Sequence, residues 1–249
     1  MDDIVDLAIY VGALDYYWEW HWLPRPPEPP LPEELIVKVY EPDDRQSRLE
    51  KIKNWREQMT NILGDRLSAP LDWDENDQWH AVATPGGKCW TALMLWTAYA
   101  EFSEEPPAVL GPPDLAEKNP IFQRLERSST PLRFRQIVQC IDYWLPAAFD
   151  AVVESPGPFE EGAFVGSSPV LLKELEALND ATWKVDRATI QQWSDAGAPA
   201  DDGLESQARY AFAELLLVAQ LSCDHRLPMK YYFDLKTLLP DLLTAARQP

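Results

Sequence analysis

The chain has 249 residues, 46% of them apolar, which is enough to bury a globular core. It carries 41 acidic residues against 22 lysines and arginines, a formal net charge of −19. A field of this sign repels nucleic-acid phosphates and anionic lipid head groups, which argues against direct binding of nucleic acid or a membrane. It favours a basic protein partner, because opposite potentials steer two proteins together. The alternative is that the acidity serves only solubility.

Three cysteines, Cys89, Cys140 and Cys223, lie far apart and have apolar neighbours. An odd number without a CxxC pair indicates buried reduced thiols, and neither a disulfide framework nor a zinc site. The acidic start Met1-Asp2-Asp3 does not resemble a secretory signal. We therefore expect a cytoplasmic protein.

The first third of the chain contains two segments with a helical period, separated by a proline-rich segment and a strand candidate. Apolar residues at spacings of three and four predict a helix over residues 4–22. The proline-dense segment 24–32 favours an extended strap, and the alternating residues 33–40 are the best strand candidate. A helix is predicted over residues 43–63, because this segment begins with acidic residues and is followed by a glycine. Residues 65–78 are then predicted to form an acidic loop.

The middle of the chain contains an almost continuous apolar run over residues 88–103, which predicts a buried central helix. Further helices are predicted over residues 130–152, 168–178, 186–196, 202–222 and 227–248, with a loop over 155–168. These elements predict an all-α protein with at most one minor strand pair. We expect a single globular helical domain over residues 1–249, with a possible subdivision near 104–120.

Recognisable catalytic motifs are missing from the sequence. There is no glycine-rich phosphate loop, no GxSxG and no HExxH, and the three histidines, His21, His80 and His225, are far apart. Residues 72–77 resemble the first half of a calcium-binding loop, but Asp77 stands where the turn needs glycine. Cys89 lies in the most apolar segment, where burial makes a thiol inert. We expect no catalytic residue, no metal and no cofactor.

The densest short acidic cluster carries aromatic residues within it, and this combination is typical of a protein interface. The predicted partner-binding residues are Asp72, Trp73, Asp74, Glu75, Asp77 and Trp79. The alternative is a solvated loop with a buried tryptophan on each side, leading into a helix at Trp79. The acidic segments 154–161 and 195–205 are the other candidates for a binding surface.

Three classes of function fit this profile. The first is a non-enzymatic acidic protein that neutralises a basic partner, most concretely a bacterial immunity protein that inhibits a cognate toxin. The second is a secretion chaperone or adaptor for an effector, which needs a long apolar groove. The third is an enzyme with an unrecognised carboxylate site, for which the candidate pairs are Glu104-Glu105, Glu160-Glu161 and Asp201-Asp202.

Overall fold

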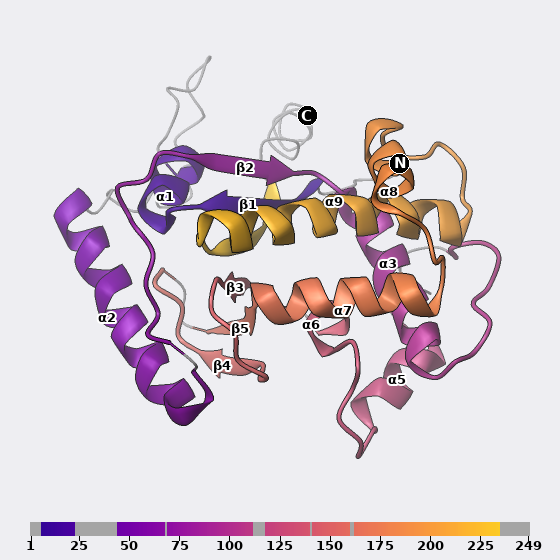
Figure 1. The fold of residues 1–249 in the computed structure, drawn as a ribbon, viewed down its shortest axis with the longest axis horizontal. Coiled ribbons are helices and arrows are strands. Elements are labelled where there is room, and N and C mark those ends of the chain that lie inside the picture. Colours follow the sequence, from indigo (N-terminus) through magenta and orange to yellow (C-terminus); the bar gives the residue numbers. More distant parts are fainter. Residues whose placement is uncertain are drawn as a thin grey trace, which may run out of the picture.

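The protein is an α/β protein built around one six-stranded mixed sheet (Figure 1). The computed structural model describes residues 6–22, 44–67, 69–111, 118–139, 141–159 and 162–234. The strands are β1 (Asp6–Gly12), β2 (His80–Ala83), β3 (Tyr143–Leu145), β4 (Val153–Ser155), β5 (Ala163–Ser167) and β6 (Met229–Asp234). The helices are α1 (Leu14–Trp22), α2 (Arg45–Leu63), α3 (Gly86–Glu101), α5 (Pro120–Glu126), α6 (Arg135–Val138), α7 (Ser168–Ala181), α8 (Arg187–Asp195) and α9 (Leu204–His225), with a 3-10 turn η2 (Gly64–Arg66). The expectation of an all-α fold is therefore wrong.

The sheet joins distant parts of the chain in the order β2-β1-β6-β3-β5-β4. β1 pairs antiparallel with β2 and with β6, so Val11 lies opposite both Ala81 and Met229. β3 is antiparallel to β6 and parallel to β5, and β4 closes the other edge antiparallel to β5. The first and last strands described, β1 and β6, are thus neighbours in the interior of the sheet.

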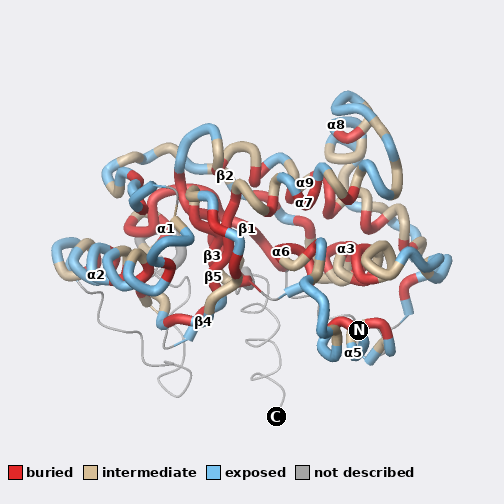
Figure 2. The backbone as a smooth tube through the Cα atoms, turned by 60° about the horizontal axis from the view of Figure 1, so that its bottom comes forward, coloured by how far each residue is buried: buried red, intermediate tan, exposed pale blue. Residues whose placement is uncertain are grey.

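Helices cover both faces of this sheet, as Figure 2 shows, with α1 and α2 on one side and α3, α7 and α9 on the other. Two successive residues of β6 mark the two faces. The ring of Tyr231 lies 5.6 Å from that of Trp90 on α3, whereas the ring of Tyr232 lies 5.6 Å from that of Tyr17 on α1. The sheet is therefore the middle layer of three, and side chains of its interior strands are enclosed on both faces, whereas Val82 of β2 and Phe164 of β5 are 39% and 42% exposed.

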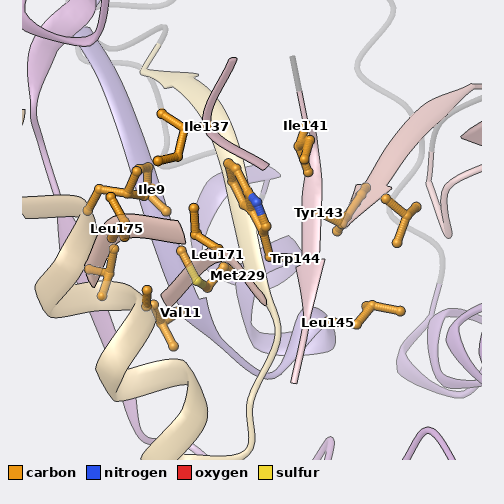
Figure 3. Close-up of a cluster of buried hydrophobic side chains, with 14 of the residues drawn as sticks. Ile9, Val11, Ile137, Ile141, Tyr143, Trp144, Leu145, Leu171, Leu175 and Met229 are labelled. Atoms are coloured by element: carbon orange, nitrogen blue, oxygen red, sulfur yellow. The ribbon is translucent and has the colours of Figure 1, made fainter. Parts of the chain in front are cut away.

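The main hydrophobic core lies between the sheet and α7 and α9 (Figure 3). Ile9 and Val11 of β1, Trp144 of β3 and Met229 of β6 are fully buried there, beside Leu171 of α7. These residues come from four segments that are far apart in the sequence. Their burial is the dominant favourable contribution to folding, because it removes large apolar areas from water.

The burial of β1 on both faces explains why it was predicted to be helical. All five residues from Leu7 to Val11 are at most 2% exposed, so the strand shows no alternation of polar and apolar side chains. A continuous apolar run is compatible with a buried strand or a buried helix, and periodicity does not separate them. The chain instead forms strand β1 and turns at Ala13 into the shorter helix α1.

Four other predictions of local structure are wrong, most of them for the same or a related reason. The segment 130–152 was predicted to be helical, but its described residues form the short helix α6 and the fully buried strand β3. The predicted loop 155–168 contains β5, and residues 229–234 of the predicted last helix form β6. Trp79 does not begin a helix but precedes edge strand β2. The proline-dense segment 24–32 and the strand candidate 33–40 lie outside the described residues.

The helices with clear end signals agree with the sequence. The Asp44 side chain accepts a hydrogen bond from the Ser47 amide at the start of α2, and the Asp186 side chain accepts one from the Thr189 amide at the start of α8. Each residue of α3 is buried or half-buried, as expected of the central helix. Whether residues 1–249 form one domain, with a subdivision near 104–120, stays a prediction.

Candidate protein-binding surface

The acidic cluster of the predicted loop 65–78 lies between the turn η2 and the edge strand β2, and we call residues 71–79 the acidic loop. Leu71 and Trp73 are both 5% exposed and anchor the loop on the core. The indole of Trp73 packs edge-on against Trp55 of α2, and the guanidinium of Arg56 lies 4.0 Å from its ring centre. The loop is therefore held to α2 by an aromatic side chain that points inward.

Glu75 also points inward. Its carboxylate accepts hydrogen bonds from the Trp73 indole N–H and, at 3.0 Å, from the backbone amide of Asp15 at the start of α1. Arg56 lies 3.6 Å away. Burial raises the pKa of Glu75, and the hydrogen bonds and Arg56 oppose that increase. The structure thus gives Trp73 and Glu75 the geometry of an internal tie between the loop, α1 and α2.

Asp72 and Asp74 are exposed and Asp77 is half-buried, whereas the Glu75 side chain is only 10% exposed. Asp74 accepts a hydrogen bond from the Asn76 amide at 2.8 Å, and Asp77 accepts one from the Trp79 amide at 2.9 Å. These bonds are those of short polar turns, and they fix the direction of both carboxylates. The Asp72 carboxylate is 79% exposed and lies 3.8 Å from Arg56. The six predicted residues therefore divide into an inner pair, three outer acids and Trp79.

Trp79 connects the loop to α9. Its ring stacks on the imidazole of His225, with 3.6 Å between ring centres and 12° between ring planes. Asp224, the residue before His225, is exposed and accepts a hydrogen bond at 2.8 Å from the side chain of Gln220, which lies one turn earlier on α9. The acidic surface of the loop therefore extends to the solvent-exposed side of α9. No local sequence signal predicts that these two segments meet.

Further along α9, two adjoining hollows lie beside α8. The first, of about 290 Å³, lies between α7, α8 and α9, and the second, of about 110 Å³, lies between α8 and α9. They share Arg187, Ile190 and Leu216, and we call them together the α8–α9 groove. Exposed carboxylates of Glu176 and Asp180 stand on the α7 side.

We call the strip from the acidic loop to the groove the α9 face. Its members are Asp72, Asp74, Asp77, Trp79, Glu176, Asp180, Asp186, Leu217, Gln220, Asp224 and His225. Hydrogen bonds from the amide and hydroxyl of Thr189 lower the pKa of the exposed Asp186, which keeps it ionised. The cations beside the strip include Lys184, Arg187 and Arg226, together with Arg56, which lies 3.8 Å from Asp72, and Arg45, which donates a hydrogen bond to Asn76. The strip itself contains seven carboxylates and no lysine or arginine.

The sequence did not indicate the groove. Leu217 of α9 is 42% exposed, but a single exposed leucine is common on protein surfaces and does not by itself indicate contact. The meeting of α7, α8 and α9 depends on tertiary packing and had no local signal.

The other chemical candidates lack the geometry of a reactive site. Burial raises the pKa of both Cys89 and Cys223 to about 11, so these thiols are protonated at neutral pH. Within the described ranges, no three His, Cys, Asp or Glu side chains gather in a way that could hold a metal. Glu104, Glu105, Asp201 and Asp202 are exposed, and residues 160–161 lie outside the described residues.

No described helix combines the length and apolar character that a membrane crossing requires. The α/β fold and the carboxylate-rich α9 face define an acidic protein whose surface is suited to binding a basic protein.

Residues 37–230 match the family described as "Putative DNA-mimic protein". This match covers more than half of the chain, and the chain belongs to that family. No curated protein and no solved structure matches it.

The family corrects our expectation about partners. The charge argument set nucleic acid aside and favoured a toxin or effector as the basic partner. The family description instead connects the acidic surface to DNA and points to a protein that binds DNA. Repulsion between this chain and DNA is still physically expected. The family description nevertheless connects the chain to DNA indirectly, through a partner that binds DNA. The negative charge of a DNA mimic serves to attract the same basic protein surface that binds DNA.

Proposed function

We propose that this protein is a non-catalytic DNA mimic that binds the DNA-contacting surface of a DNA-binding protein and excludes duplex DNA from it. The observation that carries the proposal is the family match over residues 37–230. The net charge of −19 and the exposed carboxylates of the α9 face support it physically. The proposed mechanism needs only binding, so no catalytic group is required.

The geometry of α9 suits this role. The helix carries the α9 face from Ala213 in the groove to His225 at the acidic loop, which is about 18 Å at 1.5 Å per residue. One DNA strand places a phosphate every 3.4 Å along its axis, so this length corresponds to about five phosphate steps. The acids of the α9 face lie near both ends of this length, with Asp224 and the acidic loop near His225 and with Glu176 and Asp180 beside the groove. The face therefore carries negative charge over a length comparable with a short stretch of one DNA strand.

Carboxylates and phosphates are recognised by the same side chains. Lysine and arginine on a DNA-binding surface donate charge-assisted hydrogen bonds to either group, and arginine can bind both in a bidentate way. The acids of the mimic are fixed by the fold, so less conformational entropy is lost when the partner binds.

The test is direct competition. The protein would first be used to isolate its partner from the cells that produce it, and the purified partner would then be bound to a fluorescent DNA duplex. We expect the protein to displace the duplex, with an apparent affinity that falls as salt concentration rises, because salt screens exposed charges. A ternary complex of partner, duplex and protein, or a partner without affinity for DNA, would overturn the proposal.

A further inference from the structure

The α8–α9 groove combines an apolar floor with an acidic wall. Val185, Ile190, Phe212 and Leu216 line its larger hollow, of about 290 Å³. Glu176 and Asp180 stand on the wall, four residues apart on α7, a spacing that brings their Cβ atoms to about 5–6 Å. Both acidic residues are exposed, and Ile190, the most buried residue of α8, keeps 8% of its surface accessible, so the groove is open toward solvent.

The groove is held in shape by hydrogen bonds between α7 and the segment that follows it. The Asn179 side chain donates to the Val185 carbonyl at 2.8 Å and accepts from the Val185 amide at 3.3 Å. The amide of Lys184, in the left-handed region with a φ of 55°, donates to the Asn179 carbonyl at 2.8 Å. A site fixed in this way needs little rearrangement to receive a ligand.

The groove already contains one cationic side chain, that of Arg187, which is hydrogen-bonded to a residue of α9. Arg187 lines both hollows and donates to the side-chain oxygen of Gln220 on α9, at 3.1 Å. Among the described ion pairs, none involves Glu176 or Asp180. The acidic wall is therefore available to a cation from another molecule.

We propose that this groove receives one lysine or arginine side chain of the DNA-binding partner. The aliphatic stem of that side chain lies on Ile190 and Leu216, and its cationic head contacts the carboxylates of Glu176 and Asp180. Long basic side chains bury their stems on apolar surface in this manner while the charge remains at a polar edge. The proposal rests on the proposed function and assigns an anchoring site within it.

The probe for this site is a capped hexa-arginine peptide, titrated into the full chain by calorimetry at low salt. The test variant is Glu176→Gln with Asp180→Asn, and the matched control is Glu50→Gln with Glu57→Gln, two exposed acids of α2. Both double variants remove two negative charges, so they affect long-range attraction equally. We expect the groove variant to weaken peptide binding at least tenfold and the control less than twofold.

A second measurement tests the apolar floor. Methyl NMR of the full chain should show peptide-induced shifts at Ile190 and Leu216, and none at Ile62, a methyl-bearing residue of α2 that is 43% exposed. Leu216→Asn should reduce peptide affinity at high salt as well as at low salt, because apolar contact is not screened. Circular dichroism of each variant confirms that the fold is retained.

The outcomes separate the groove from the wider function. Equal losses of peptide affinity in the two double variants, or methyl shifts at Ile62 as large as those at Ile190, would overturn the proposal that the groove binds a basic side chain. The competition with duplex DNA would then still support the mimic, because surface carboxylates alone suffice for it. If the unmodified chain does not bind the peptide, the proposed anchoring site is overturned. If the protein does not displace duplex DNA from its partner, the proposed DNA-mimic function is overturned.

Discussion

The carboxylate of Glu174, on α7, accepts a hydrogen bond of 2.7 Å from the backbone amide of Gln136, at the start of the short helix α6. Both residues are buried, and the Gln136 side chain in turn accepts from the Ser167 amide and donates to the Ala151 carbonyl. One buried acid thus closes a polar network that joins α6, α7 and β5. Burial raises the pKa of Glu174 to about 8, although its hydrogen bonds and Arg135 oppose the increase.

This raised pKa predicts that the protein loses stability as the pH rises toward 8. In the unfolded chain the Glu174 carboxyl loses its proton near its ordinary pKa of 4.5, but in the folded protein it does so near 8. Between these values the folded state holds one proton more, so the free energy of unfolding falls by up to about 1.4 kcal/mol per pH unit. Below 4.5 this contribution is fully present, and above 8 it is lost.

Glu174→Gln removes the titrating group and keeps a hydrogen-bond acceptor. We expect urea unfolding across this pH interval to show a smaller decline for Glu174→Gln than for the unmodified protein. The control is Glu176→Gln, two residues along α7, where the carboxylate is exposed. Parallel curves for the unmodified protein and Glu174→Gln would show that Glu174 keeps an ordinary pKa.

The central helix α3 gives a second prediction. Leu93 and Leu95 are 0% and 2% exposed, and truncation of either leaves a cavity that the surrounding side chains fill only in part. Leu93→Ala and Leu95→Ala should each reduce the free energy of unfolding by about 2–5 kcal/mol in chemical denaturation. Leu217→Ala on α9 is the comparison, because that leucine is half-exposed. A loss below about 0.5 kcal/mol at Leu93 or Leu95 would assign α3 to a surface and not to the core.

Trp73 is predicted to act on stability. Trp73→Ala deletes a ring that packs on Trp55 and Arg56, and it also removes a hydrogen-bond donor from Glu75. We expect a loss of about 3–5 kcal/mol in chemical denaturation. Asp74→Ala, at an exposed neighbour in the same loop, should change stability by less than about 1 kcal/mol. If Trp73→Ala unfolds at the same denaturant concentration as the unmodified protein, the indole is not an anchor of the loop.

The outer acids of the loop are predicted to control the rate of association with the partner. Replacing Asp72, Asp74 and Asp77 with asparagine keeps their hydrogen-bonding shape and removes three negative charges at the rim. We expect slower association and a weaker dependence of the association rate on salt, with little change in dissociation. Surface plasmon resonance with the isolated partner measures both rates.

Trp79 should behave in the opposite way, because its half-buried ring is the loop aromatic that a partner can reach. Trp79→Ala should increase the dissociation rate and leave association almost unchanged. The matched control for the acids is a triple variant of Glu50, Glu57 and Asp65, exposed acids of α2 and η2. Equal slowing by both triple variants would assign the effect to net charge, and unchanged rates in all variants would exclude the loop from the interface.

The sequence by itself determined the charge, the thiol chemistry and the helices with capped ends. Asp44, Asp186 and Gly64 act on their own neighbours, so signals of this kind are complete within a few residues. The acidic cluster at 72–77 was also visible, because it needs no partner from elsewhere in the chain.

Tertiary structure decided the sheet and the shape of the candidate surface. β1, β3 and β6 are buried on both faces, and a strand enclosed in this way loses the alternation that distinguishes it from a helix. The division of the acidic loop into inward and outward side chains depends on α1 and α2, which lie far from it in sequence. The stacking of Trp79 on His225 requires the acidic loop to meet the end of α9, and the groove requires α7, α8 and α9 to pack together. These contacts join residues that are far apart in the sequence.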